Sequence, residues 1–318
     1  MALHVKAPKE EGQHLMRILS GSSGIDRQYS VQRIGDTILI PVTERGVADL
    51  AGTGYEIVNA EPLVRKKKPQ PVQSRGSYDA IGRIAVVKKK CDRRQEELAR
   101  SLVESGTFDT VFMDHGISGD LRLRDLEIKA GRELYVTDHR ENGITLRVNV
   151  ARAYFSPRLA TERLLVAKSC RPGDLVLDMF AGIGPFSITI AKIAHSRVVA
   201  VDKNPVAIAW MIYNINKNRV GELVTPHLMD SRQVPDLGLS FDRIVMNLPH
   251  GAMEYIDEAL SVLNEKGSIH LYLITDLAGL EAAMTGIGKR GLRLVSKRVV
   301  HGYSPRESLY SLYLRRNR

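Results

Sequence analysis

Short apolar segments alternate with longer helical patterns from about residue 151 to the end of the chain, and this alternation constrains the fold more than any other feature. Apolar strands separated by helices are typical of a parallel β-sheet that helices cover on both faces. Such a sheet binds its ligand beyond the carboxyl ends of its strands. The predicted strands are 174–178, 197–202, 223–229, 241–246, 268–274, 293–300 and 309–314, and the predicted helices are 184–194, 205–218, 252–263 and 277–289.

Polar side chains stand at the ends of four successive predicted strands. Asp178, Asp202 and Asp230 follow the first three strands, and Asn247 follows the fourth. An acid after the second strand can accept hydrogen bonds from both hydroxyls of a ribose, and an acid after the third can accept one from an adenine amino group. Each acid alone could instead cap a helix. Together, at one edge of one sheet, they indicate a single ligand site.

A glycine-containing turn follows the first predicted strand. Gly182 and Gly184 stand just before the next helix, where glycine lets the backbone approach a ligand closely. The turn lacks the third glycine of the G-x-G-x-x-G dinucleotide fingerprint, and it lacks the Lys-Ser/Thr pair of a P-loop. The sequence therefore argues against both of those nucleotide-binding loops.

Basic residues are concentrated before the alternating region. The chain has 46 Lys and Arg against 36 Asp and Glu, a formal net charge of +10, and residues 51–100 hold twelve of the basic residues and six of the acidic ones. The segment 65–71 joins basic residues to two prolines, as a solvated linker does, and 88–90 is a run of lysines. Both clusters could also contact phosphate groups. A polyanionic partner is therefore expected.

The basic linker divides the region before the alternating pattern into two parts. The first part contains a predicted helix at 13–20 and a strand at 37–42, and the second contains strands at 81–87, 110–113 and 145–148 and a helix at 93–105. The predicted domains are an N-terminal module at 1–66, the linker at 67–74, a middle domain at 75–150 and the alternating domain at 151–318.

Several classes of protein are excluded by simple features. Cys91 and Cys170 have no paired spacing, which excludes a disulfide framework and a cysteine-based zinc site. The polar N-terminus does not resemble a signal peptide. The most apolar stretch, 175–194, contains polar breaks and does not read as a membrane span. We therefore expect a soluble, cytoplasmic protein.

The motifs at the strand ends resemble those of class I S-adenosylmethionine-dependent methyltransferases. They are DMFAGIG at 178–184, VDKNP at 201–205, the acid Asp230 and NLPH at 247–250. Two further segments, HRENG at 139–143 and YFSPRLATER at 154–163, resemble the archaeal and eukaryotic tRNA methyltransferases that modify N1 of guanosine 37, 3′ to the anticodon. The resemblance covers residues 75–318, whereas the N-terminal module matches only in size and placement.

This resemblance implies an α/β protein with a C-terminal class I methyltransferase domain. That domain is Rossmann-like, with a mostly parallel seven-stranded sheet and helices on both faces, and it is preceded by a middle α+β RNA-binding domain and a small N-terminal α/β module. The implied cofactor is S-adenosylmethionine, and magnesium is suggested as an aid, although we can place no metal site. The implied partner is tRNA, bound through its anticodon stem-loop and its body by a monomer.

The chemistry of this methyl transfer calls for specific side chains. N1 of guanine carries a proton at neutral pH, so a general base is required, and charge that develops on O6 calls for a cationic donor. The resemblance places Glu162 as the base and Arg122 on O6, although Arg124 shares the same alternation phase. Asn247 can hold the guanine edge or contact the cofactor. Glu162 could instead pair with Arg158, and either arginine could be a solvated charge.

The resemblance also implies a set of cofactor-binding residues. Arg163 matches the family position that contacts the cofactor carboxylate, and Phe180 could line the cofactor pocket or pack in the core. Tyr154 or Phe155 could contact an everted base, and core packing is the alternative for both. The full predicted cofactor set is Tyr154, Arg163, Asp178, Phe180, Gly182, Gly184, Asp202, Lys203, Asp230, Ser231, Asn247 and Pro249.

Three other functions compete with methylation of tRNA. Wybutosine-pathway enzymes transfer the aminocarboxypropyl group of the same cofactor, but they replace the Asn-Leu-Pro segment that this chain keeps at 247–249. An inactive RNA-binding protein on the same fold is disfavoured by the intact strand-end acids. A methyltransferase for small molecules or proteins is disfavoured by the positive charge and the two extra modules.

Overall fold

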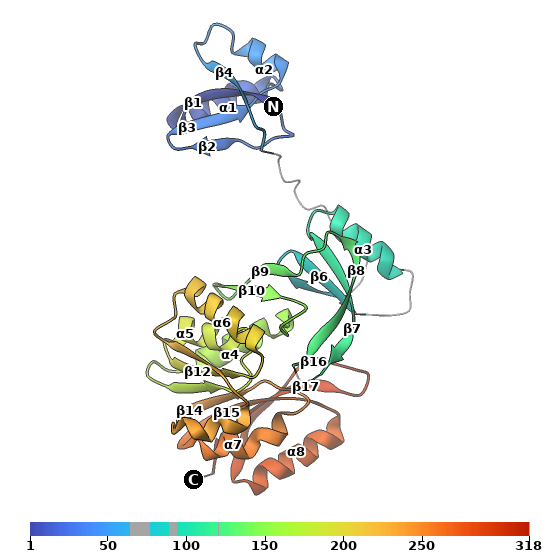
Figure 1. Cartoon of the computed structure of the whole chain (residues 1–318), viewed down its shortest axis with the longest axis vertical. Coiled ribbons are helices and arrows are strands. Elements are labelled where there is room, and N and C mark those ends of the chain that lie inside the picture. The colour runs from blue at the N-terminus through green and yellow to red at the C-terminus, as the bar shows by residue number, and fades with distance from the viewer. Residues whose placement is uncertain (64–76, 89–93, 120, 318) are drawn as a thin grey trace. The chain divides into compact units, whose positions relative to one another are not determined.

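The computed structural model describes residues 1–63, 77–88, 94–119 and 121–317. Contacts divide the chain into two compact units, Met1–Gln70 and Pro71–Arg318. Figure 1 shows the elements of both units, which we describe separately. The predicted linker at 67–74, the basic segment 65–71 and two lysines of the run 88–90 lie outside the described residues.

The N-terminal unit is a small sheet packed on helices. Its strands lie in the order β2-β3-β1-β4, and Val5, Leu15, Leu19 and Ile40 form the centre of its apolar core. The predicted helix at 13–20 and strand at 37–42 are confirmed. The elements are β1 (Ala2–Pro8), η1 (Lys9–Glu11), α1 (Gly12–Gly21), β2 (Gln32–Ile34), β3 (Thr37–Pro41), α2 (Glu44–Asp49) and β4 (Glu56–Ala60).

The second unit begins with a sheet in the order β5-β6-β7-β8. Its elements are β5 (Tyr78–Ile81), β6 (Ile84–Lys88), α3 (Arg94–Glu104), β7 (Thr110–Ser118) and β8 (Leu123–Gly131). The strand predicted at 81–87 is confirmed for 84–87, which lie in β6, but the chain reverses at Gly82, so Ile81 belongs to β5 of the antiparallel pair β5–β6. Gly82 has φ +54°, and a Cβ there would lie 2.3 Å from the backbone oxygen of Asp138. Only glycine fits this turn without displacing its neighbour.

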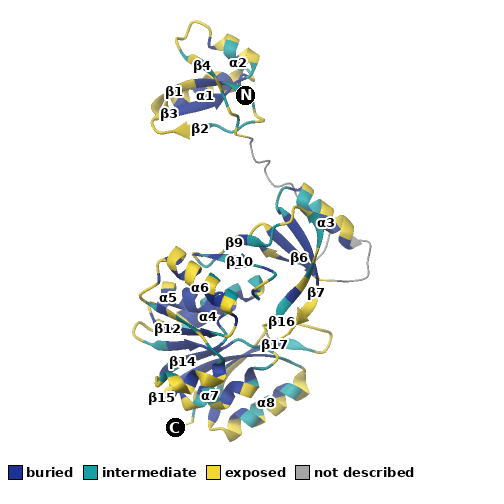
Figure 2. Cartoon of the chain, viewed as in Figure 1, coloured by how far each residue is buried: buried dark blue, intermediate teal, exposed yellow. Residues whose placement is uncertain are grey.

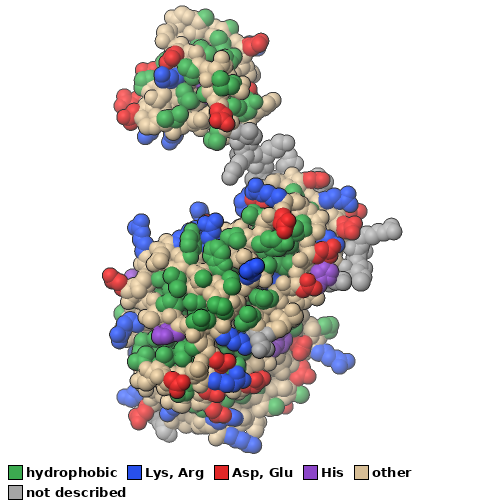
Figure 3. Space-filling view, in the orientation of Figure 1, with side chains coloured by type: hydrophobic (Ala, Val, Ile, Leu, Met, Phe, Trp, Pro, Cys, Tyr) green, Lys and Arg blue, Asp and Glu red, His purple; other side chains and the backbone are tan. Residues whose placement is uncertain are grey.

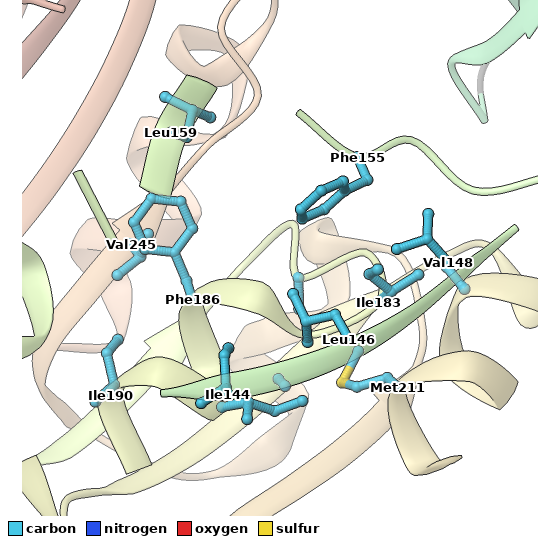
Figure 4. Packing of buried hydrophobic residues seen from close by; sticks show 14 of the residues in the cluster. Ile144, Leu146, Val148, Phe155, Leu159, Ile183, Phe186, Ile190, Met211 and Val245 are labelled. Atoms are coloured by element: carbon cyan, nitrogen blue, oxygen red, sulfur yellow. The ribbon is translucent and has the colours of Figure 1, made fainter. Parts of the chain in front are cut away.

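A two-stranded hairpin, β9 (Val136–Glu141) and β10 (Ile144–Asn149), packs on the helices of the large sheet. Figure 4 shows Leu146 and Val148 of β10 beside Ile183 and Met211, and Ile144 farther along the strand on the side of Ile190. The same apolar core continues into the middle sheet through Ile84 and Phe112. The predicted domain boundary between residues 150 and 151 stays a prediction, since one core crosses it.

The edge of β10 is held by two asparagines of α6 (Pro205–Asn218). Asn218 accepts a hydrogen bond from the Thr145 amide at 2.9 Å and donates to the Thr145 carbonyl at 2.8 Å. Asn214 does the same for Arg147, at 2.7 Å and 3.1 Å. Two side-chain amides therefore bond with the backbone of β10 as a third strand would.

The predicted seven-stranded, mostly parallel sheet is confirmed. Its order is β13-β12-β11-β14-β15-β17-β16, with β17 antiparallel to both of its neighbours and the pairs from β13 to β15 parallel. The strands are β11 (Leu175–Asp178), β12 (Arg197–Asp202), β13 (Val224–Leu228), β14 (Phe241–Met246), β15 (Leu263–Thr275), β16 (Leu292–Gly302) and β17 (Ser308–Arg316).

Helices cover both faces of this sheet, because alternate residues of each strand are apolar on opposite sides. Val176 packs under α4 and α5, whereas Leu177 packs in the second core, which contains residues of α7 and α8. Figure 2 shows the sheet buried and the outer faces of these helices exposed. The helices are η2 (Pro157–Leu159), α4 (Ala160–Ser169), α5 (Pro185–Ala194), η3 (Ser231–Leu237), η4 (Ala252–Tyr255), α7 (Ile256–Ser261) and α8 (Leu277–Lys289).

The helix predicted at 252–263 is corrected in two respects. It is a 3₁₀ turn, η4, followed by the short α7, and Leu263 already belongs to β15. Among the described residues, no helix is both long and apolar enough to cross a membrane.

Candidate active site

A cavity of about 330 Å³ lies at the carboxyl ends of the central strands, where the sequence places its polar residues. It is lined by the turn after β11, the ends of β12 and β14 and the segment before α4. The predicted residues that line it are Arg122, Tyr154, Arg163, Phe180, Gly182, Asp202, Lys203, Asp230, Ser231, Asn247 and Pro249. Eleven predicted residues from separate segments thus meet in one place.

Asp202 is held in a fixed orientation at the floor of this cavity. Its Oδ2 accepts a hydrogen bond from the Gly182 amide at 2.7 Å, and its Oδ1 accepts one from the Asn204 amide at 2.8 Å. Burial raises the pKa of Asp202, while these two backbone donors act in the opposite direction. Each carboxylate oxygen keeps a further acceptor position, so the side chain can receive two hydroxyl groups of a bound ribose.

Asp178 and Gly184 do not line the cavity but lie behind its wall. Asp178 Oδ2 accepts a hydrogen bond from Ser187 at 2.7 Å, whereas the buried Oδ1 has no hydrogen-bond partner within the described residues. Burial raises the pKa of Asp178 to about 7. Gly184 has φ +86°, and a Cβ there would lie 2.8 Å from Met211 Cγ, so this glycine serves packing. Direct cofactor contact by these two residues stays a prediction.

Asp230 and Ser231 follow β13. Both make hydrogen bonds within the protein and also line the cavity. The Asp230 side chain caps η3 by accepting from the Arg232 amide at 2.9 Å, so the capping alternative also holds for it. The Ser231 hydroxyl donates to the Met179 carbonyl. Both residues also line the cavity, which leaves Asp230 able to accept from a ligand.

A second cavity, of about 490 Å³, adjoins the first. Arg122, Tyr154, Asn247 and Pro249 line both cavities. The buried Oδ1 of Asn247 has no hydrogen-bond partner in the described part of the chain. An unpaired buried polar atom is costly, and the residue that carries this one lines both cavities.

Arg122 and Arg124 differ in their hydrogen-bond and ion-pair partners within the protein. Arg124 is buried, donates to Asp114 at 2.5 Å and to the Phe155 carbonyl at 3.1 Å. Arg122 has the unusual φ of +54° and no carboxylate partner among the residues that the structure describes. Arg122 is therefore the arginine available to a ligand, whereas Arg124 holds the loop in place.

The predicted base, Glu162, lies in the first turn of α4 and lines neither cavity. It is 4% exposed, and its Oε2 accepts from Arg298 Nη2 at 2.7 Å and from the Tyr272 hydroxyl at 3.3 Å. Residues Arg158 and Leu159, one helical turn earlier, line the second cavity. The alternative of a pair with Arg158 is not observed, since Arg158 donates to Asp79 at 2.6 Å.

Arg163 lines the first cavity but is largely occupied by Glu141. Its Nε and Nη2 bond to the two carboxylate oxygens of Glu141 at 2.5 Å and 2.6 Å, and the residue is 1% exposed. Burial alone would raise the pKa of Glu141, but hydrogen bonds from His139 and Arg163 hold it below its ordinary value. A cofactor-carboxylate role for Arg163 stays a prediction, because only Nη1 lacks a partner within the described region.

Phe155 and Tyr154, the two aromatic residues considered as contacts for an everted base, differ in burial and in the cavities that they line. Phe155 is buried in the core against His139, with ring centroids 5.1 Å apart, although it touches the first cavity. Tyr154 lines both cavities. Phe180 does both of the things considered for it, since it lines the first cavity and packs edge-on against Tyr255 at 5.0 Å.

Sequence reasoning missed several residues that shape the site. Glu141, Tyr272, Arg298, His250 and Tyr303 contact predicted residues or line a cavity. Two of these residues belong to motifs that the sequence analysis singled out, His250 to NLPH and Glu141 to HRENG, but neither was given a role there. The described residues contain no group of three or more His, Cys, Asp or Glu side chains placed to hold a metal ion.

The strand order, the glycine turn and the strand-end acids define the class I methyltransferases. Residues 137–286 match the family model described as the TRM5/TYW2 methyltransferase domain. The tRNA (guanine(37)-N(1))-methyltransferase Trm5b of Pyrococcus abyssi is 38% identical, over 96% of this chain and 97% of that protein. The chain therefore belongs to the Trm5/TYW2 family of methyltransferases.

Two further similarities extend this result. A solved complex of aTrm5 and tRNALeu has a TM-score of 0.70 and 30% identity, over 99% of this chain and 100% of that one. A tRNA(Phe) (4-demethylwyosine(37)-C(7)) aminocarboxypropyltransferase of Pyrococcus horikoshii is 37% identical, but over 51% of this chain and 58% of that protein. Similarity over the full length is thus to the methyltransferase branch.

Proposed function

We propose that this protein transfers a methyl group from S-adenosylmethionine to N1 of guanosine 37 in tRNA. The observation that carries this proposal is the position of Asn247, which lines both cavities. One cavity has the strand-end acids of a nucleoside site, and the other has the available cation Arg122. Full-length similarity to guanine-37 N1-methyltransferases supports the same reaction.

The first cavity fits the cofactor. Asp202 would accept the ribose hydroxyls, and Asp230 would accept from the adenine. Phe180 supplies an apolar wall. S-adenosylmethionine contributes a methyl carbon made electrophilic by the attached sulfonium. The residues of the cavity would orient the cofactor and keep water from it.

The second cavity would receive the substrate base. The reacting edge of a guanine is hidden in a stack, so the nucleotide must be everted before it can react. Arg122 then donates to O6 and stabilises the negative charge that forms there as N1 loses its proton. Asn247 holds the purine edge next to the methyl carbon. Together these contacts place N1 in line with the transferred group.

Glu162 would accept the N1 proton. A general base must come within about 2.6–3.2 Å of the proton that it removes, directly or through one intermediate group. Glu162 lies one helical turn beyond residues that line the second cavity, and it is bound to Arg298. In this proposal Arg298 keeps the carboxylate oriented, and the N1 proton reaches it through one intermediate group when the base enters.

Contacts outside the cavities would bind the rest of the tRNA. Lys and Arg side chains are spread over the face seen in Figure 3, among Asp and Glu side chains. Such distributed cations suit a phosphate backbone, which they position without reading sequence. We further propose that the N-terminal unit contacts the tRNA body and recognises its shape, and that the protein acts as a monomer. A magnesium requirement stays a prediction without an assigned site.

One experiment tests the function directly. Unmodified tRNA with guanosine at position 37 is incubated with the protein and labelled S-adenosylmethionine, and the nucleosides are analysed by mass spectrometry. We expect 1-methylguanosine, and none from a matched transcript with adenosine at position 37. A product carrying the larger aminocarboxypropyl group would identify the other branch of the family. An unmodified position 37 with the cofactor bound would contradict both.

A further inference from the structure

The hairpin between β16 and β17 carries an exposed tyrosine into the second cavity. Tyr303 lines this cavity and is 40% exposed. Its amide donates to the Glu307 carbonyl at 2.9 Å, and the Ser304 hydroxyl donates to Glu307 Oε2 at 3.0 Å. These bonds close the tip of the hairpin, so the ring is presented on a structured turn.

The ring of Tyr303 meets two side chains from distant parts of the unit. His250, in the loop after β14, packs edge-on against it with centroids 5.3 Å apart, and Lys88 Nζ of β6 lies over its face at 5.1 Å. All three residues line the second cavity. Burial, and then the charge of Arg122, lower the pKa of His250, so its ring stays uncharged at neutral pH.

Tyr154, the other tyrosine of this cavity, is less available to a ligand. The guanidinium groups of Arg122 and Arg124 lie over its ring at 5.6 Å and 5.3 Å. Arg124 cannot withdraw easily, because buried bonds to Asp114 and to the Phe155 carbonyl hold it. Lys88 is an exposed side chain, so a ligand can displace it from the face of Tyr303.

We propose that Tyr303 is the stacking contact for the substrate purine in the second cavity, with His250 fixing the ring and Lys88 moving to an adjoining phosphate. This inference rests on the proposed function, since it assumes an everted nucleotide. Stacking on an aromatic side chain stabilises a bound nucleic-acid base of any kind, because every base has a π-face. The ring of Tyr303 suits a purine base, and the Lys88 ammonium beside it suits the phosphate of the same nucleotide.

The test uses a tRNA transcript with 2-aminopurine at position 37, a base whose fluorescence is quenched by stacking. The full-length protein is compared with Tyr303→Leu, Tyr303→Phe and the control Tyr213→Leu. Tyr213 is a matched control because it is 41% exposed and has Lys217 Nζ over its ring at 5.6 Å, but it lies on α6 and lines neither cavity. Methylation of the guanosine-37 transcript is measured in parallel.

We expect quenched fluorescence with the wild type and with Tyr213→Leu, bright fluorescence with Tyr303→Leu, and quenching restored by Tyr303→Phe. Tyr303→Leu should lose about tenfold or more in kcat/KM for tRNA, with the KM for S-adenosylmethionine unchanged. Wild-type quenching and kcat/KM in Tyr303→Leu would overturn the stacking assignment while leaving the methyltransferase function intact. A wild type that leaves guanosine 37 unmodified would refute the function instead, and the fluorescence would still decide the stacking.

Discussion

Arg298 Nη2 donates a hydrogen bond of 2.7 Å to Glu162 Oε2, which ties the edge strand of the large sheet to the first turn of α4. Arg298 pairs with Ser311 across β16 and β17, and Ser311 pairs with Tyr272 across β17 and β15. Residues directly opposite each other point to the same face of a sheet. Tyr272, Ser311 and Arg298 therefore lie side by side on one face of the sheet, and Tyr272 and Arg298 both donate to the carboxylate of Glu162.

Replacing Glu162 tests whether this carboxylate is the base. We expect Glu162→Gln to lower kcat by about 10²- to 10⁴-fold, because an amide cannot accept the N1 proton. The cofactor affinity should stay unchanged, since Glu162 does not line the first cavity. Single-turnover kinetics and calorimetry measure the two quantities. Turnover equal to that of the wild type would dismiss Glu162 as the base.

Arg298 should matter through Glu162 and not through folding. Its side chain is 47% exposed, so Arg298→Ala should change the unfolding midpoint little, while kcat falls because the carboxylate loses its orientation. Arg298→Lys keeps the charge and should restore most of kcat. The KM for tRNA and kcat are measured separately for both variants. Equal losses in the Ala and Lys variants would argue against an orienting role.

Asp202 should determine cofactor affinity. Asp202→Ala removes an acceptor that two backbone amides already orient, and a hydrogen bond to a charged group contributes about 1.5–3 kcal/mol. We therefore expect the Kd for S-adenosylmethionine, measured by calorimetry, to rise about 10- to 100-fold. Asp236→Ala, an exposed acid in η3, is the control and should bind normally. An unchanged Kd in Asp202→Ala would move the cofactor away from this strand end.

Asp178 should make the free protein less stable as pH rises. Burial raises its pKa to about 7, above the value of the unfolded chain, so the folded state holds its proton where the unfolded state has released it. The free energy of unfolding therefore falls between about pH 4 and pH 7 on account of this group. Asp178→Asn removes this contribution. Chemical denaturation of both proteins should show the variant gaining stability relative to the wild type across that window, and a constant difference would contradict the assignment.

The pair of Glu141 and Arg163 should support the fold. Removing Glu141 leaves a guanidinium that is 1% exposed without its carboxylate, which typically costs about 3–5 kcal/mol. Denaturant unfolding of Glu141→Ala should show this loss. Asp257→Ala breaks an exposed pair with Arg290 and should leave the free energy of unfolding nearly unchanged. If both variants unfold alike, the buried pair is not a support of the fold.

The parts of the structure that were predicted correctly are those set by local pattern. Alternating apolar segments gave all seven strands of the large sheet, and the strand-end position of Asp202 follows from the topology alone. β8 and β9 were missed because their sequences, rich in charged residues, carry little apolar signal. The hairpin turn at Gly82 was missed because the apolar run continues on both sides of it.

The contacts of the site depend on residues far apart in the chain. Sequence spacing gave no reason to place Arg298 on Glu162, since 136 positions separate them. Likewise, the occupation of Arg163 by Glu141 depends on how the β9–β10 hairpin packs, which local pattern does not encode. Eleven residues that line the first cavity were therefore predicted, whereas Asp178, Gly184 and Glu162 line neither cavity and the internal partners were missed.

The two asparagines of α6 have a consequence for the behaviour of the protein in concentrated solution. A lone hairpin exposes a row of amide and carbonyl groups that another chain can extend, which is a route to aggregation. Asn214 and Asn218 occupy those groups at Thr145 and Arg147. At these two residues the β10 edge therefore offers no template for intermolecular strand addition.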